Sequence, residues 1–201
     1  MAEGSASRAA LLALRRDRRV IEEGHRFLDE RRVALAHELL RRTRAYSDHR
    51  ASLLRRHEEL RVALGDAIGR HGLEGLQVYP AARLRPAAGR READFLGVRL
   101  VDAIAIELNA AAPAEATWRT SEAARCALAA QALAQDAAAL AGEVASLLRL
   151  AREYRRTERR VRALENIVLP EARADERRFE GALEELDQEE VLRSRRFARA
   201  P

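Results

Sequence analysis

Metal-binding or nucleophilic chemistry in this chain would have to come from its five histidines and its one cysteine. They are His25, His37, His49, His57, His71 and Cys126. A helical metal site needs ligands three or four residues apart, so that both point to the same side of the helix. No two histidines have that spacing, and one cysteine offers no second thiolate. We therefore expect no metal site, and we interpret Cys126 as a small apolar side chain in an Ala-rich helix.

Phosphate binding and acid–base catalysis find equally little support. Glycines lie at positions 65, 69, 72 and 75, but the Lys-Ser or Lys-Thr of a phosphate-binding loop does not follow them. Carboxylates are abundant, yet they alternate with arginine, which is typical of a solvated helix face. We expect no cofactor and no catalytic residue, so the chain should act without performing a reaction itself.

Two apolar heptad repeats indicate the elements that organise the chain. The first consists of Leu14, Ile21, Leu28 and Leu35, then Leu39, Tyr46, Leu53 and Leu60; the second of Leu133, Leu140, Leu147, Tyr154, Val161 and Val168. A seven-residue repeat places a narrow apolar stripe on a helix, and only another helix buries such a stripe. The four-residue step from Leu35 to Leu39 is a stutter, which locally unwinds a left-handed supercoil. We expect an all-α-dominated fold with a long antiparallel two-helix coiled coil formed by the N- and C-terminal helices.

Composition supports a thin, elongated core. The 201 residues are 34% charged and 4% aromatic, and the helix formers Ala, Leu, Glu and Arg dominate. We predict an N-terminal coiled-coil helix over residues 8–68, capped by a serine at position 5 or 7. A C-terminal coiled-coil helix is predicted over residues 114–196. Because Pro170 removes a backbone donor, this helix should bend or break near residues 166–170.

A short central module is expected over residues 69–113. Residues 76–79 predict a short strand, and residues 83–91, with a proline and a glycine, predict a turn or loop. Apolar residues partly alternate over residues 95–108, which predicts a second strand, so the module should contain a β-hairpin. A two-stranded hairpin is marginal in water and should pack on the coiled coil or on a partner.

Charge gives further limits on the function. All 37 basic residues are arginine, which we attribute first to the coding bias of a high-GC bacterial genome. The basic excess lies on the two helical ends, with 15 Arg against 9 acids in residues 8–61 and 14 against 12 in residues 149–199. Interleaved acids and scarce aromatic side chains argue against nucleic acid as a partner. A single cysteine favours a reducing compartment, and the sequence predicts neither a signal peptide nor a membrane span.

Residues 22–35 and 159–170 carry the most specific motifs. The first contains Gly-His, a leucine three residues on and a basic pair; the second ends in Ala-Leu-Glu-Asn, aliphatic residues and a proline. The positions are Gly24, His25, Leu28, Arg31, Arg32 and Leu35, and Val161, Ala163, Leu164, Glu165, Asn166, Val168 and Pro170. With the helix–module–helix layout, these motifs resemble the D subunit of the A/V-type (vacuolar-type) rotary ATPases and ATP synthases.

This resemblance implies the central rotor shaft, or stalk, of a proton- or sodium-translocating ATPase. Such a non-catalytic subunit transmits torque between the catalytic head and the ion-translocating membrane ring. The implied partners are the catalytic and non-catalytic head subunits, a small F subunit of the stalk and the funnel-shaped subunit that caps the ring, without direct nucleic-acid binding or membrane insertion. We expect a peripheral location on the cytoplasmic side of a bacterial membrane, with Arg15, Arg16, Arg193 and Arg196 facing the head.

Three other functions remain as alternatives. A generic antiparallel coiled-coil scaffold or regulator would have no link to an ATPase. The shaft of an F-type synthase normally carries a larger α/β domain, for which residues 65–113 are too few. A nucleic-acid-binding helical hairpin would lose affinity steeply with salt.

Overall fold

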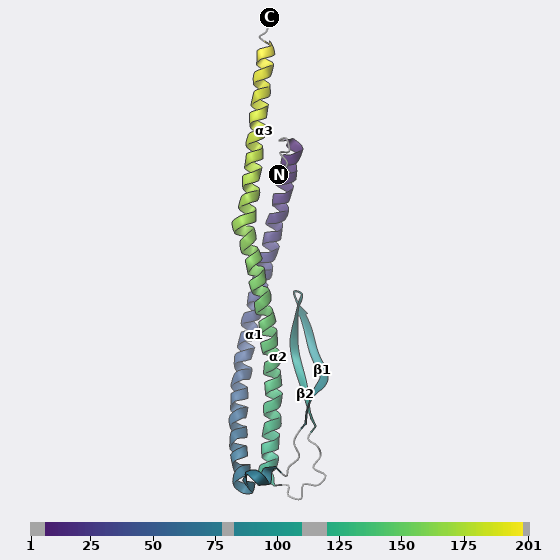
Figure 1. Ribbon diagram of the computed structural model, residues 1–201, viewed down its shortest axis with the longest axis vertical. Coiled ribbons are helices and arrows are strands. Elements are labelled where there is room, and N and C mark those ends of the chain that lie inside the picture. The colour runs from purple at the N-terminus through teal and green to yellow at the C-terminus, as the bar shows by residue number, and fades with distance from the viewer. Residues whose placement is uncertain (1–6, 78–82, 110–119, 199–201) are drawn as a thin grey trace. The chain divides into compact units, whose positions relative to one another are not determined.

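The computed structural model describes residues 7–77, 83–109 and 120–198 of the chain. The elements are α1 (Arg8–Leu76), β1 (Arg83–Phe95), β2 (Val98–Asn109), α2 (Ser121–Ala163), the π-helical segment η1 (Leu164–Val168) and α3 (Leu169–Ala198) (Figure 1). They form two compact units: unit 1 contains Met1–Ala34 and Tyr154–Pro201, and unit 2 contains Leu35–Glu153. These units do not follow the three predicted segments, and that three-part division stays a prediction. No helix in the described part of the chain has the length and apolarity needed to span a membrane.

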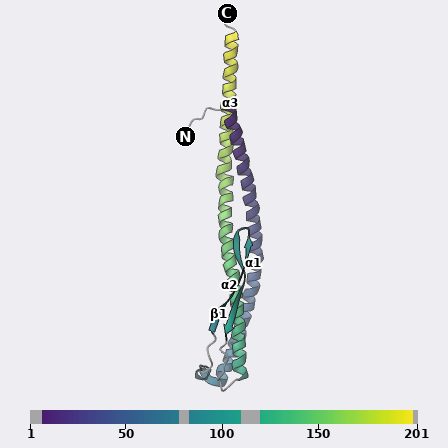
Figure 2. The ribbon, with the colours of Figure 1, turned by 90° about the vertical axis from the view of Figure 1, so that its right-hand side faces the viewer.

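Unit 1 is an antiparallel helix pair between the start of α1 and the run of α2, η1 and α3 (Figures 1 and 2). Ion pairs between the helices establish the direction: Arg8 lies 3.5 Å from Asp187, and Glu22 lies 3.3 Å from Arg173. As the residue number rises on one helix, it falls on the other. Ser7 caps α1, because its Oγ accepts a hydrogen bond of 3.1 Å from the Ala10 backbone N–H, as predicted for one of the two serines.

Unit 2 pairs the rest of α1 with α2 in the same antiparallel sense. Ser52 donates a 3.0 Å hydrogen bond to Asp136, and further along, the His71 and Thr120 side chains lie 2.6 Å apart. Together with the pairing in unit 1, these contacts confirm the predicted antiparallel pairing of the N- and C-terminal helices.

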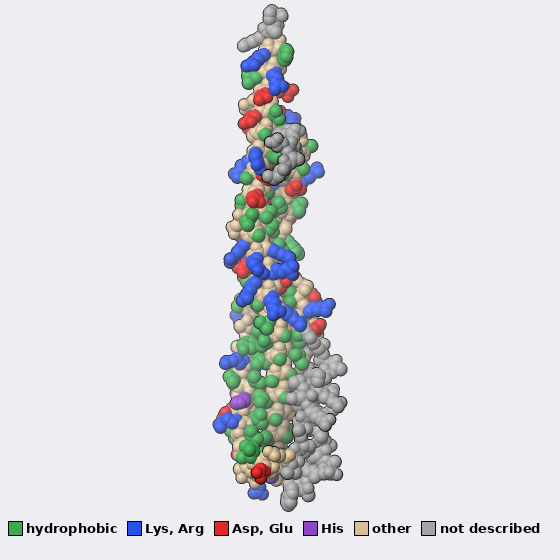
Figure 3. Space-filling model, viewed as in Figure 1, with side chains coloured by type: hydrophobic (Ala, Val, Ile, Leu, Met, Phe, Trp, Pro, Cys, Tyr) green, Lys and Arg blue, Asp and Glu red, His purple; other side chains and the backbone are tan. Residues whose placement is uncertain are grey.

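The heptad residues form the buried seam between the helices. None of the fourteen is exposed, and Leu35 and Val161 are 0% and 1% exposed. Apolar residues one position off the repeat, such as Leu54 and Leu148, are 54% exposed. Over unit 2, Figure 3 shows hydrophobic side chains following the line where the two helices meet. The repeat therefore identified the packed face of each helix correctly.

A β-hairpin follows α1; its second strand, β2, overlaps the strand predicted over residues 95–108, whereas its first strand is displaced from the predicted position. The prediction of a loop over residues 83–91 was wrong, because β1 begins at Arg83 and pairs with β2 antiparallel. Of the strand predicted over residues 76–79, Leu76 ends α1, Gln77 is a turn, and the other two residues lie outside the described part. The strands join through Leu96 and Gly97, whose φ angles of 52° and 76° suit the tight primed turns that hairpins favour.

Of the glycines expected to break the first helix, only Gly72 interrupts its geometry, as a kink inside α1. Gly65 and Gly69 keep helical geometry, and only Gly72, with φ 71° and ψ 165°, leaves it. That conformation strains any residue with a Cβ atom, so the glycine at this position marks the break in α1.

Pro170 changes the second helix without breaking it. The helix widens into η1 just before the proline, where the Leu169 N–H donates to the Leu164 carbonyl, five residues back. Proline offers no N–H to the carbonyl four residues earlier, and its ring would press on that carbonyl in a regular α-helix. The wider turn accommodates the ring, and α3 continues to Ala198.

Candidate functional site

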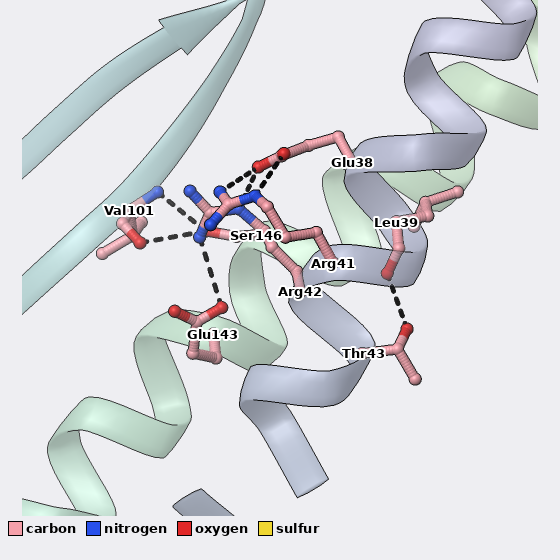
Figure 4. A network of polar contacts seen from close by, with 8 residues as sticks. All are labelled: Glu38, Leu39, Arg41, Arg42, Thr43, Val101, Glu143 and Ser146. Atoms are coloured by element: carbon pink, nitrogen blue, oxygen red, sulfur yellow. Dashed lines mark hydrogen bonds and ion pairs between the residues drawn. The ribbon is translucent and has the colours of Figure 1, made fainter. Parts of the chain in front are cut away.

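A buried arginine lies between the two helices of unit 2, close to the hairpin (Figure 4). The Arg42 side chain is 6% exposed; its Nε lies 2.8 Å from Glu38, and its Nη1 lies 3.2 Å from Glu143 on α2. The Nε and Nη2 atoms of Arg41 donate hydrogen bonds of 2.7 and 2.6 Å to the two carboxylate oxygens of the same Glu38. We call Glu38, Arg41, Arg42 and Glu143 the Arg42 cluster. Glu38, Arg42 and Glu143 are nearly buried and paired in this cluster, Arg41 binds Glu38 in bidentate geometry, and the Arg42–Glu143 pair links α1 to α2.

The stutter explains why charges enter the seam here. Seven residues after Leu35, the next position of the first repeat is Arg42 instead of an apolar residue. The repeat resumes from Leu39, which is half-buried. Buried polar groups at such positions fix the register of paired helices, because any other alignment leaves a charge without a partner.

Electrostatics in the Arg42 cluster favour the ionised carboxylate. Hydrogen bonds from Arg41, and then from Arg42, lower the pKa of Glu38 below its ordinary value, although burial of the carboxylate works in the opposite direction. The carboxylate therefore stays charged over the whole physiological range.

The hairpin is fastened to α2 by Ser146, which is fully buried. Its Oγ accepts a 2.8 Å hydrogen bond from the Val101 N–H and donates one of 3.1 Å to the Val101 carbonyl (Figure 4). One hydroxyl thus satisfies both backbone groups on the edge of β2 that faces away from β1. The Arg149 guanidinium adds a 2.9 Å hydrogen bond to the Arg99 carbonyl.

A small residue on α2 and an irregularity in the strand pairing support the attachment of the hairpin to α2. A Cβ atom at Gly142 would lie 3.3 Å from Val101, so the small residue lets β2 approach α2 closely. The register shifts by one residue between Arg91 and Glu92, whose partners are Ala103 and Val101. This is a β-bulge, which redirects the local backbone. It coincides with Val101, the residue whose backbone turns toward α2.

In unit 1, ion pairs join the two helices beside the seam. Arg15 contacts Glu180 at 2.6 Å and Glu176 at 3.2 Å, and Arg18 contacts Glu176 at 2.8 Å. Glu180, followed by Glu176, raises the pKa of Arg15 further. The arrangement joins two arginines of α1 to two carboxylates of α3.

Comparison with known proteins identifies the family. The family model for the ATP synthase D subunit matches residues 10–199, which is nearly the whole chain. This chain belongs to the family of ATP synthase D subunits. A similar protein, the V-type ATP synthase D subunit of Anaeromyxobacter dehalogenans strain 2CP-C, is 33% identical over 100% of this chain and 99% of its own length. The A-type ATP synthase D subunit of Methanopyrus kandleri is 29% identical over 94% of this chain and 83% of its own length.

Membership of the D-subunit family confirms the resemblance inferred from the two motifs. In the structure, residues 22–34 of the first motif and all of the second lie in unit 1. Gly24, Leu28 and Val168 are half-buried in the helix pair, and Glu165 and Asn166 are exposed on η1. The second motif thus coincides with the end of α2, η1 and the first turn of α3.

Within the first motif, His25 and Arg32 have contrasting surroundings. The Nε2 atom of His25 is buried and has no hydrogen-bond partner among the described residues. Arg32 lies 2.6 Å from Asp29, one turn earlier on the same helix. The described part of the chain contains no group of three or more potential metal ligands.

The four arginines predicted to face the head differ in their surroundings. Arg15 is engaged with two glutamates, and Arg193 lies 3.1 Å from Glu189. Arg16 and Arg196 are exposed and have no ion pair within the described residues. The structure brings none of the N-terminal two into contact with the C-terminal two, and contact with a head stays a prediction for all four.

Sequence reasoning missed the Arg42 cluster and the Ser146 anchor. For Arg42 a signal was present, because the arginine occupies an in-phase heptad position with a glutamate four residues before it. For Ser146, a lone serine in an Ala-rich helix gave no indication that the hairpin would pack there.

Proposed function

We propose that this member of the D-subunit family is the central shaft of a V/A-type ATPase, transmitting torque between the catalytic head and the ion-translocating ring. Its partners in this proposal are the catalytic and non-catalytic head subunits, a small F subunit and the funnel-shaped subunit on the ring. The chain itself is non-catalytic and lies peripherally on the cytoplasmic side of the membrane. Torque passes through it when each nucleotide state of the head favours a different shaft angle.

The observation that carries this proposal is the antiparallel helix pair in each unit, in a chain of this family. In unit 1, Arg15 and Arg18 bridge to α3 through Glu176. In unit 2, Arg42 bridges to α2 through Glu143. Twisting a helix pair displaces such bridges and the buried seam together, so paired helices resist torsion better than one helix. The charged outer faces suit many weak contacts, because each exposed ion pair contributes little.

The direct test is reconstitution with the head. The full chain, purified and mixed with an alternating head that lacks its central shaft, should bind with one copy per head. A bead attached at Gln77, in the turn that follows α1, should then rotate in one direction when ATP is added, because the chain termini face the head in this proposal. A chain that stays apart from the head, or a bound chain that does not turn, would favour the generic scaffold.

Two of the terminal arginines give a sharper test of the head contact. Arg16→Gln with Arg196→Gln should reduce ATP-driven rotation while leaving the fold intact, because both side chains are exposed and unpaired within the described residues. A matched control neutralises Arg61 and Arg162, which are also exposed but already have partners at Glu58 and Glu158. Equal rotation in both variants would dismiss Arg16 and Arg196 as head contacts.

A further inference from the structure

One turn of α2 contacts both the hairpin and α1 within unit 2. Gly142 and Ser146 of this turn face the hairpin: a Cβ atom at Gly142 would lie 3.3 Å from Val101, and the Ser146 hydroxyl binds the Val101 backbone. Glu143, which lies between them in the sequence, binds Arg42 of α1 at 3.2 Å. Residues three or four apart are neighbours on a helix surface. The attachment of the hairpin and the pairing with α1 therefore lie side by side on α2.

Strand β2 is covered on both of its faces beside this turn. Leu100 and Val101 are consecutive, so their side chains point to opposite faces of the hairpin, yet both residues are only 2% exposed. Ser146, to which β2 is hydrogen-bonded, is fully buried as well. The docked hairpin thus excludes water from this part of α2.

The charges of the Arg42 cluster lie next to this buried contact. Figure 4 shows the Arg42 guanidinium group beside the Val101 backbone and the Ser146 hydroxyl. The side chains of Arg42 and Glu143 are only 6% and 14% exposed. Opposite charges attract more strongly away from water, but a buried carboxylate that loses its partner is costly until water reaches it. Opening of the hairpin is the movement that would admit water to Glu143.

We propose that the hairpin is a releasable cover over the Arg42 cluster. Undocking of the hairpin from α2 and loss of the Arg42–Glu143 pair favour each other, because each brings water to the same turn of α2. A docked hairpin strengthens the pair, and an intact pair leaves no buried charge that favours opening. A partner that draws the hairpin away from α2 therefore loosens the α1–α2 pairing at Arg42. The inference concerns unit 2 itself and goes beyond the proposed function.

Amide exchange in the full chain tests this coupling. Exchange of residues 98–101 reports opening of the hairpin, and exchange of residues 147–150, which include the fully buried Leu150, reports opening of α2. In Arg42→Met the first should rise relative to the second by at least about fivefold, the lower end of the coupling between linked sites. Adding Glu143→Leu removes the unpaired carboxylate and should return this ratio to within about twofold of the unmodified chain.

The control is Leu53→Ala, which weakens the same helix pair away from the hairpin. Leu53 is a half-buried residue of the first heptad repeat and lies about 16 Å from Arg42 along α1. Its loss leaves no charge unpaired, so the ratio should change by less than about twofold. The reciprocal variant is Ser146→Ala, which loosens the hairpin. It should speed exchange of residues 39–43 relative to residues 51–55 by about fivefold or more, because coupling between two sites is mutual.

Three results would overturn the inference. Equal acceleration of every segment in Arg42→Met would reduce its effect to a general loss of stability. Hairpin exchange that stays fast after Glu143→Leu is added would place the cause in lost packing at position 42 instead of the unpaired carboxylate. Unchanged exchange of residues 39–43 in Ser146→Ala would refute the coupling even if Arg42→Met fails to fold, which circular dichroism at 222 nm detects. The proposed shaft function stands under each of these results.

Discussion

Replacing Arg42 by methionine tests whether the buried charge cluster determines the stability of unit 2. Methionine keeps the aliphatic length but removes the guanidinium, which leaves Glu143, 14% exposed, without its arginine, while Glu38 keeps Arg41. Breaking a buried ion pair by removing one partner costs about 3–5 kcal/mol. We expect the lower end, about 3 kcal/mol, because Glu38 stays paired. For a chain of this size that corresponds to a melting temperature lower by about 6–12 °C.

A double-mutant cycle separates charge from packing at this site. Arg42→Met with Glu143→Leu removes both charges, and apolar replacements of buried pairs are often neutral. The double variant should therefore recover about 2 kcal/mol relative to Arg42→Met alone, measured by urea unfolding of the full chain with circular dichroism at 222 nm. The control is Arg61→Met; the pair of Arg61 with Glu58 is 67% and 58% exposed, so its loss should change the stability little. A loss below about 1 kcal/mol for Arg42→Met, or strict additivity in the double variant, would refute this reasoning.

Three further predictions concern the other polar contacts. Because the folded-state pKa of Glu38 lies below its ordinary value of 4.5, its stabilisation is present above that pH and is lost as the pH falls through the folded value. In Arg41→Gln, acid titration followed by circular dichroism should therefore show a stability deficit at neutral pH that shrinks as the pH falls below 4.5; a deficit independent of pH would contradict this. Ser146→Ala leaves two buried backbone groups of Val101 unsatisfied and should cost about 1–3 kcal/mol, with faster amide exchange in β2 than in α1; unchanged exchange at Val101 would exclude the anchor. Pro170→Ala restores a backbone donor, so amide exchange across η1 should slow to the rate of the flanking helices; exchange that stays fast would show that η1 does not depend on the proline.

The sequence predicted the helices and their contact face well, because heptad spacing is a long, redundant signal. Leu35 and Val161 are buried where the repeat places them, and Ser7 caps α1 as expected. The family followed from short motifs, and the match to the family model over residues 10–199 confirms it. Each of these features depends on the spacing of residues that are close together in the sequence, and a single sequence shows that spacing directly.

The central module was harder to predict, because its geometry depends on contacts distant in sequence. β1 contains a proline and several arginines, which locally indicate a loop, yet pairing with β2 makes it a strand. Its turn uses Leu96 and Gly97 with positive φ angles, and leucine rarely adopts that conformation. The attachment of β2 to Ser146 joins residues 45 positions apart, and no periodic pattern encodes such a contact.

The π-helical segment η1 also bears on how this family can gain and lose residues. Before η1, the buried seam follows Val161; after it, the inward positions are Leu169, Glu176 and Leu183, one place later than a strict repeat from Val161 would give. A π-turn holds one residue more than the α-turn that it replaces, so it absorbs an insertion without rotating the helix beyond it. Deleting a single residue from η1 in a Pro170→Ala background should then yield an ordinary α-helix whose downstream side chains keep their partners. We therefore expect single-residue insertions and deletions among relatives to occur at η1 more often than in the neighbouring helical turns.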